Sequence, residues 1–333
     1  MHSLKRDLRA TPLYREAASL HQRLRRPGSG QISDAVELQA SPVAREAVFA
    51  GTLVDRLEGV PPTRICRIDL DTGDCRVATF GPHTDRLPKY SPDGRTIAFL
   101  SDRDQGGDFQ LHLLDVTTGA VRSTPRVEGW VEYHHWSADS QRLLLGVAGH
   151  GADISGGQGA VPSRRQSDPA PGWMPVVESG DETYQWRGVW IYDLETNRVQ
   201  RIAIPGCNVW EAVWCGRDAL AILSSSRPGE GHWYRACVKT VELGSQRTET
   251  LYQPEDQLGG LAASPNGAYL AVVEAVCSDR GLVAGDLRLI DMGSHKTHQV
   301  NTNGVDVSAL EWRSNTRLVM SKNTNGPIHA AIR

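Results

Sequence analysis

The sequence predicts an all-β fold made of repeated four-stranded units, and three observations carry this prediction. The 33 glycines and 18 prolines are scattered along the 333 residues, as in chains that turn often between short strands. A tight-turn motif followed by an apolar strand recurs along the chain, and so does an apolar strand that ends in an acidic residue. Because the two motifs recur at the same intervals, they divide the chain into repeating units.

The tight-turn motif is clearest in the segment YSPDGRTIAFLSDRD, which begins at Tyr90. Proline and glycine at the second and fourth positions of Ser91–Gly94 suit a type I turn, and the apolar run that follows suits a strand. The residues aligned with the turn serine are Ser41, Ser91, Ser137, Cys215, Ser264 and Arg313. They are separated by 50, 46, 78, 49 and 49 residues.

The second motif places an acid at the end of an apolar strand. These acids are Asp69, Asp115, Asp193, Glu242 and Asp291, at intervals of 46, 78, 49 and 49 residues. A carboxylate in this position is expected to accept N–H groups of the following turn, and its recurrence favours a structural role over catalysis. Each unit therefore contains strand, turn, strand, loop, strand, turn and strand.

Four strands in about 45 residues are typical of a β-propeller blade. The two-residue alternation of QLHLLDV excludes helical repeats, whereas a solenoid of strands stays an alternative. We expect a propeller over residues 31–333, with five units and most of a sixth. The last unit offers three strands, VSALEWR, RLVMSK and PIHAAIR. Because an unclosed blade leaves unpaired strand edges, we expect this chain to be part of a longer protein.

Residues 1–30 are expected to form a helical segment ahead of the propeller. Between Pro12 and Arg26, apolar side chains recur at helical spacing and share one face; they are Leu13, Ala17, Leu20 and Leu24. Such a face predicts packing against another surface. That surface belongs either to the propeller or to a domain outside this chain.

The interval of 78 residues reveals an insertion of about 30 residues, spanning roughly 150–186. It is rich in glycine, proline and serine, and loops of this length are often functional. Its acids suit the free amino terminus of a peptide, and its tryptophans suit a ligand surface; a plain solvated insertion is the alternative. The candidate substrate-gating residues are Trp173, Glu178, Asp181, Glu182, Trp186 and Arg187, and Trp130 and Trp233 are further candidates for a ligand surface.

Composition excludes several classes of function. The net charge of −3 argues against a nucleic-acid partner. The chain has no run of 18 apolar residues, so no membrane span is predicted. The charged N-terminus lacks the apolar region of a signal peptide, which favours the cytoplasm.

No cofactor or metal is expected, because no histidines have metal-ligand spacing and His134 and His135 point to opposite faces of a strand. The six cysteines are expected to be free, although Cys66 and Cys75 lie on neighbouring predicted strands.

Several segments resemble the propeller of the prolyl oligopeptidase family of serine peptidases, especially its acylaminoacyl-peptidase-like members. They are PKYSPDGRTIAFLSDRD, EYHHWSADSQRLLLGVAG and LLDVTTGAVR, and the similarity covers about residues 31–333. The resemblance implies about seven blades and an α/β-hydrolase domain, placed after the propeller, that carries the catalytic Ser, Asp and His. The G-x-S-x-G motif of the nucleophile is absent here, so no catalytic residue is assigned to this chain.

The function that the resemblance implies is substrate gating in a peptidase that hydrolyses short peptides, of acylaminoacyl- or oligopeptidase type. The serine that forms the acyl-enzyme would lie outside this chain. The implied partners are short peptides and the hydrolase domain of the same protein, on which the N-terminal helix would dock; a homo-oligomer is compatible with the sequence. The WD40-like blade motif is shared with TolB-type propellers, so a stand-alone protein-interaction module is the main alternative. A propeller enzyme with its site in the central channel is a third, for which the sequence assembles no residues.

Overall fold

The structure is a computed structural model that describes residues 7–24, 32–53, 61–150, 152, 186–276, 280 and 283–322. The chain divides into two compact units. Unit 1 comprises Met1–Gly106 and Leu111–Ser123, and unit 2 comprises Gly107–Gln110 and Thr124–Arg333.

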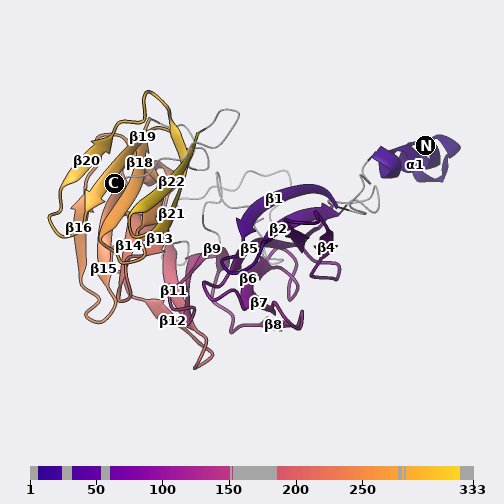
Figure 1. Cartoon of the computed structure of the whole chain (residues 1–333), viewed down its shortest axis with the longest axis horizontal. Coiled ribbons are helices and arrows are strands. Elements are labelled where there is room, and N and C mark those ends of the chain that lie inside the picture. The colour runs from indigo at the N-terminus through magenta and orange to yellow at the C-terminus, as the bar shows by residue number, and fades with distance from the viewer. Residues whose placement is uncertain are drawn as a thin grey trace, which may run out of the picture. The chain divides into compact units, whose positions relative to one another are not determined.

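Unit 1 begins with the predicted helix. A short 3-10 turn, η1 (Leu8–Ala10), precedes α1 (Pro12–Leu24) (Figure 1). Proline suits the first helical turn, where its missing N–H is not needed, and the hydroxyl of Thr11 accepts the Tyr14 N–H at 3.2 Å. Leu13 and Leu20 of the predicted apolar face are 75% and 48% exposed, and the surface on which they pack stays a prediction.

Unit 1 then forms two four-stranded sheets in which each strand pairs with the next along the chain. The first contains β1 (Ile32–Ala40), β2 (Glu46–Leu53), β3 (Thr63–Asp69) and β4 (Cys75–Val77). The second contains β5 (Asp85–Tyr90), β6 (Thr96–Ser101), β7 (Gln110–Asp115) and β8 (Val121–Ser123), of which only Gln110 is assigned to unit 2.

Unit 2 continues the same pattern. Its four-stranded sheets are β9 (Trp130–Trp136), β10 (Arg142–Ala148), β11 (Arg187–Asp193) and β12 (Arg198–Ile202); β13 (Asn208–Trp214), β14 (Ala219–Ser225), β15 (Cys237–Glu242) and β16 (Thr248–Tyr252); and β17 (Gln257–Ala263), β18 (Tyr269–Ala275), β19 (Asp286–Asp291) and β20 (Thr297–Val300). A two-stranded sheet follows, β21 (Val307–Ser314) and β22 (Arg317–Lys322), and a short helix, α2 (Glu230–Trp233), lies between β14 and β15.

These sheets confirm the predicted β-propeller. Within the described residues there are five four-stranded antiparallel sheets and one two-stranded sheet, which match the five units and the beginning of a sixth. The third strand expected in the last unit, PIHAAIR, lies outside the described residues. A solenoid is not formed, because consecutive strands pair within one antiparallel sheet before the chain moves to the next.

Both repeated motifs form the expected turns. The hydroxyl of Ser91 donates to Asp93 at 2.5 Å and accepts the Thr96 N–H at 3.0 Å, and Ser137 and Ser264 make the same contacts in their turns. The acids of the second motif accept backbone N–H groups two or three residues ahead; they are Asp69, Asp115, Asp193 and Asp291. The N–H three residues ahead is the main cause of the lowered pKa of each carboxyl. The structural role expected for these acids is confirmed.

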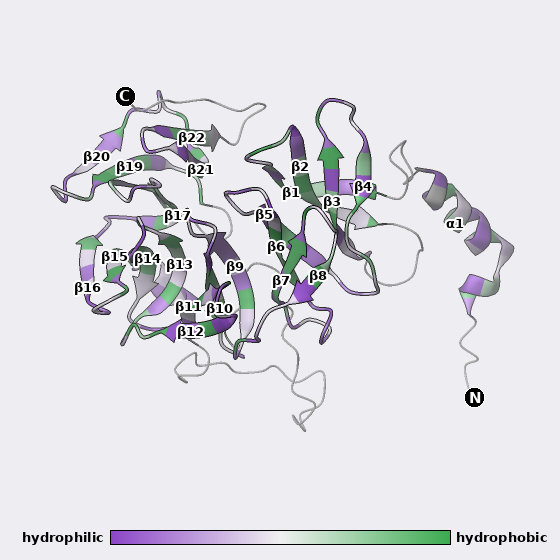
Figure 2. Ribbon diagram, turned by 60° about the horizontal axis from the view of Figure 1, so that its bottom comes forward, coloured by the Kyte–Doolittle hydropathy of each residue, from purple (hydrophilic) through white to green (hydrophobic). Residues whose placement is uncertain are grey.

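The hydrophobic core lies between neighbouring sheets. In unit 2, Leu144 and Val189 of one sheet pack with Val209 and Leu220 of the next. The second strands, such as β10 and β14, are buried along almost their whole length. For β14 the reason is that a sheet of unit 2 packs on each of its faces. Figure 2 shows the hydrophobic colour on central strands such as β6, whereas β8 and β12 are largely hydrophilic. Cys66 on β3 and Cys75 on β4 are free thiols.

Candidate functional site

The two ends of each sheet differ. In a four-stranded meander, the turns after the first and third strands lie at one end, which we call the turn end. The connection after the second strand and the connection to the next sheet lie at the other end, which we call the long-connection end. In unit 2, among the described residues, the long-connection end receives residues 149, 150, 152 and 186, the segment with α2, and Arg280. The residues that depart from the repeat therefore gather there.

A buried ion pair lies at the long-connection end of unit 2. The guanidinium of Arg187, the first residue of β11, donates from Nε and Nη2 to the two carboxylate oxygens of Glu132 on β9, at 2.9 and 3.0 Å. The two side chains are only 1% and 2% exposed. The backbone N–H of Arg187 donates to Asn208 at 2.7 Å. This bidentate geometry is the strong form of a charge-assisted hydrogen bond, so it fixes the start of β11.

The ion pair is part of a larger charged cluster, which we define as Glu132, Arg187, Trp210, Glu211 and Arg280. The Cζ atoms of Arg187 and Arg280 lie 5.0 and 5.1 Å from the centre of the Trp210 ring, within the range of cation–π contact. The carboxylate of Glu211 accepts the Leu261 N–H of the next sheet at 3.0 Å. A glutamate of unit 1 repeats this link, because Glu37 accepts the Leu87 N–H.

Burial perturbs the ionisable members of this region. Burial raises the pKa of Glu211, although the Leu261 N–H and the charge of Arg280 act in the opposite direction. Burial also lowers the pKa of Arg280, and the nearby charge of Arg187 adds to this effect. The pKa of the adjacent Tyr133 is raised well above its usual value, again mainly by burial. Perturbed groups that cluster in this way are typical of functional sites.

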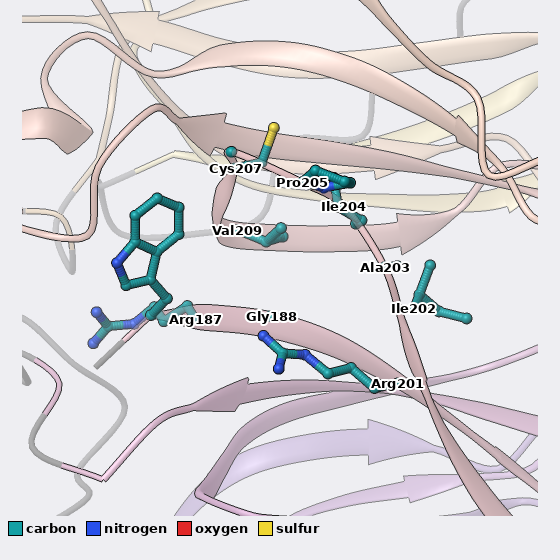
Figure 3. A pocket seen from close by; sticks show the side chains of 11 residues that line it. Arg187, Gly188, Arg201, Ile202, Ala203, Ile204, Pro205, Cys207 and Val209 are labelled. Carbon is teal, nitrogen blue, oxygen red and sulfur yellow. The ribbon is translucent and has the colours of Figure 1, made fainter. Parts of the chain in front are cut away.

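A pocket of about 440 Å³ shares Arg187 with the charged cluster. Figure 3 shows Cys207, Pro205 and Ile204 on one side and Arg187, Gly188 and Arg201 on the other. Its full lining is Trp186, Arg187, Gly188, Arg201, Ile202, Ala203, Ile204, Pro205, Gly206, Cys207 and Val209. This lining has two guanidinium groups, an apolar wall and no acidic side chain, so it suits a ligand that combines an apolar part with a polar acceptor or a negative charge.

Two further contacts shape this pocket. The guanidinium of Arg201 lies over the ring of Trp190, with 5.0 Å between Cζ and the ring centre. The ammonium of Lys239 donates to the thiol of Cys207 at 3.3 Å. Arg201 is exposed, so unlike Arg187 it can reach a ligand without giving up a carboxylate partner.

The structure brings two of the six candidate gating residues together, Trp186 and Arg187, which both line the pocket. The other four, Trp173, Glu178, Asp181 and Glu182, lie outside the described residues. The expectation that Trp130 and Trp233 form a ligand surface is wrong, because they are 1% and 0% exposed and belong to the core.

Sequence reasoning missed most of the charged cluster and most of the pocket. A usable signal existed for the glutamates, since Glu132 and Glu211 interrupt the apolar strands VEYHHW and NVWEAVW. An acid inside such a strand needs a partner once it is buried. No comparable signal marked Arg280 or Arg201, which lie in variable parts of their repeats.

Two kinds of site are not found within the described part of the chain. There, no group of three or more His, Cys, Asp and Glu side chains could hold a metal ion. In the same residues no helix is long and apolar enough to cross a membrane.

Comparison by sequence finds a peptidase. No protein-family model matches the chain. An uncharacterized peptidase of Bacillus subtilis (strain 168), YuxL, is 30% identical over 117 residues. The match covers 35% of this chain and 18% of that protein, so it spans less than a fifth of the relative's length.

Comparison with solved structures finds the propeller domain of a protease, a peptidase and a lyase. The β-propeller domain of the Trilobed protease from Pyrococcus furiosus aligns with a TM-score of 0.56 and 14% identity, covering 87% of this chain and 79% of that chain. Pyrococcus horikoshii acylaminoacyl peptidase gives 0.56 and 14%, covering 85% and 42%. An oligogalacturonate lyase in complex with manganese gives 0.56 and 15%, covering 86% and 69%.

At these identities the structural alignments establish the fold alone. The sequence match adds a similarity to a peptidase. The chain spans less than half of the acylaminoacyl peptidase chain. The resemblance that the blade motifs indicated is thereby confirmed: this chain is a β-propeller similar to the propeller portion of peptidases.

Proposed function

We propose that this chain is the substrate-gating propeller of a serine peptidase of the prolyl oligopeptidase family, and that the α/β-hydrolase domain belongs to the same full-length protein. The observation that carries the proposal is the 30% identity with a peptidase over 117 residues, because it is a likeness of sequence and not of fold alone. The fold shared with a protease propeller domain supports it. The proposal includes a cytoplasmic protein that acts on short peptides of acylaminoacyl- or oligopeptidase type.

The long-connection end of unit 2 supports the gating role. Its pocket offers the guanidinium of Arg201 beside the apolar wall of Ile202, Ile204 and Val209. A short peptide presents carbonyl oxygens and side chains that match such a lining. Binding there positions the peptide, while the reaction forms an acyl-enzyme on a serine of the hydrolase domain.

The decisive experiment uses the protein encoded by the complete reading frame. We expect it to hydrolyse chromogenic short peptides and to spare a large folded protein. A variant without residues 32–322 should lose this size discrimination. If the complete protein has no nucleophilic serine and no peptidase activity, the proposal fails, and a TolB-like protein-interaction module becomes the better interpretation.

The pocket is tested separately in the same enzyme. Arg201→Gln should raise KM for short peptides with kcat unchanged, because it removes binding that is uniform along the reaction. Arg198→Gln is the matched control, since Arg198 is exposed on the same strand and does not line the pocket. Equal effects of the two substitutions would show that the pocket does not bind substrate.

A further inference from the structure

Two arginines contact the same tryptophan but differ in what their N–H groups bind. Arg187 and Arg280 both lie about 5 Å from the Trp210 ring. The Nε and Nη2 atoms of Arg187 hold both carboxylate oxygens of Glu132. The same two atoms of Arg280 are buried, and they have no hydrogen-bond partner among the described residues.

Unsatisfied buried donors are rare and unfavourable, so such a pair calls for an explanation. Nε and Nη2 form one edge of the guanidinium, with two nearly parallel N–H bonds. A carboxylate satisfies this edge with both oxygens at once, as Glu132 does for Arg187. Arg280 is half-buried as a whole, whereas its Nε and Nη2 atoms are buried.

The acids around Arg280 are Glu132, Glu211 and, on α2, Glu230. Glu132 is already held by Arg187. Glu211 accepts the Leu261 N–H, and no hydrogen bond joins it to the Arg280 edge. These acids stabilise the charge of Arg280 at a distance without occupying its Nε and Nη2 atoms.

We propose that Arg280, positioned by Trp210, binds a carboxylate of the peptide that this propeller admits. The carboxylate comes either from the C-terminus of the peptide or from an Asp or Glu side chain, because the two present the same pair of oxygens. Binding of a carboxylate needs no peptidase activity, whereas its assignment to a peptide substrate rests on the proposed function. Arg187 stays paired with Glu132, which holds the Arg187 guanidinium in place.

The test is a calorimetric binding titration of the purified 333-residue chain, which requires no hydrolase domain. The probes are acetyl-Ala-Ala with a free C-terminus, acetyl-Ala-Ala amide, acetyl-Asp-Ala amide and inorganic phosphate. We expect at least one peptide with a carboxylate to bind about tenfold more tightly than acetyl-Ala-Ala amide, since two charge-assisted hydrogen bonds are gained. The free-acid and aspartyl peptides distinguish the two sources of the carboxylate.

Variants connect the binding to Arg280. Arg280→Gln should abolish the preference for a carboxylate, and Arg280→Lys, which keeps the charge but loses the paired edge, should also weaken it. Arg247→Gln is the control, because Arg247 is an exposed arginine of the same unit that pairs with Glu249 and does not belong to the charged cluster. An unchanged urea midpoint of Arg280→Gln shows that the variant folds; if it does not fold, Arg280→Lys decides.

Two results would overturn the proposal. One is equal affinity of the original chain for carboxylate and amide peptides, or a preference for the carboxylate that Arg280→Gln retains. The other is binding of phosphate without binding of either carboxylate peptide. Neither result bears on the peptidase reaction, so a failure here is distinguishable from a failure of the proposed function.

Discussion

The turn end and the long-connection end of the sheets use acidic residues in opposite ways. At the turn end, exposed acids such as Asp115 and Asp291 accept N–H groups of their own turns, which lowers the pKa of each carboxyl. At the long-connection end of unit 2, Glu132 and Glu211 come from strands, and their partners lie far away in the sequence. The acids of the turn end thus act locally, whereas Glu132 and Glu211 join segments that are distant in the sequence.

This difference separates the scaffold from the candidate site. The turn contacts recur from sheet to sheet, as a structural role requires. The contacts of Arg187 with Glu132 and of Arg280 with Trp210 occur once among the described residues. A departure from the repeat at a buried position is therefore the feature that points to function in this fold.

The largest expected effect comes from breaking the buried ion pair. Arg187→Met leaves the carboxylate of Glu132 buried without its partner and should lower the free energy of unfolding by about 3 to 5 kcal/mol. Urea unfolding followed by tryptophan fluorescence measures this loss in unit 2 alone, because all nine tryptophans belong to that unit. The double variant Glu132→Leu, Arg187→Met should regain part of the stability. An unchanged urea midpoint for Arg187→Met would contradict the assignment.

The next largest effect is expected from a comparison of two glycines of unit 2, one at the turn end and one at the long-connection end of the sheets. Gly267 and Gly304 have φ angles of 70° and 73°, so alanine costs about 1 kcal/mol at either position. A Cβ at Gly267 would also lie 2.7 Å from the backbone N of Gly216, whereas nothing lies within 4 Å at Gly304. Gly267→Ala should therefore cost about 1 to 3 kcal/mol more than Gly304→Ala. Equal urea midpoints of the two variants would show that the turn end tolerates a shift of backbone.

The acids at the two ends should give opposite pH dependences. The lowered pKa of Asp291 means that its stabilisation is present above the ordinary value of 3.8 and is lost as the pH falls through the folded pKa. The raised pKa of Glu211 means that its contribution is present below 4.5 and is lost as the pH rises through the folded pKa.

Substitutions make this contrast measurable. With increasing pH, the stability of the original chain should rise relative to Asp291→Asn and fall relative to Glu211→Gln. Urea unfolding of the three chains between acid and neutral pH is the measurement. If the two stability differences changed in the same direction with pH, burial would not determine the direction of the pKa shift of Glu211.

The smallest effect is expected at an exposed ion pair. Arg313 donates to Glu311 at 2.7 Å, with side chains 54% and 61% exposed. Water screens such a pair, so Arg313→Gln should change the free energy of unfolding by less than about 1 kcal/mol. A loss as large as that of Arg187→Met would remove the distinction between buried and surface charge on which the candidate site depends.

Much of the fold could be predicted from the sequence, because its determinants are local. The turn at Ser91–Gly94 and the acid at Asp115 act within a few residues, so each copy of the motif carries its own evidence. The repeated spacing then placed the strands and revealed the insertion. The N-terminal helix followed from apolar residues at helical intervals, as α1 shows.

The candidate site could be predicted only in part. Trp186 and Arg187 were predicted as gating residues because they border the insertion. Both line the pocket, and their gating role stays a prediction. Burial contradicted the interpretation of Trp130 and Trp233, since an indole outside the repeat consensus can still fill a core. Whether a side chain faces a ligand depends on the neighbouring sheet, which local pattern does not specify.

By itself, the sequence determined that this protein is a chain of four-stranded blades and where each blade turns. Only the tertiary structure decided that Glu132, Arg187, Glu211 and Arg280 meet around Trp210. The physical reason is the range of the interactions. Turn hydrogen bonds join residues two to five positions apart, whereas the charged cluster joins three sheets whose side chains become neighbours only when the sheets pack.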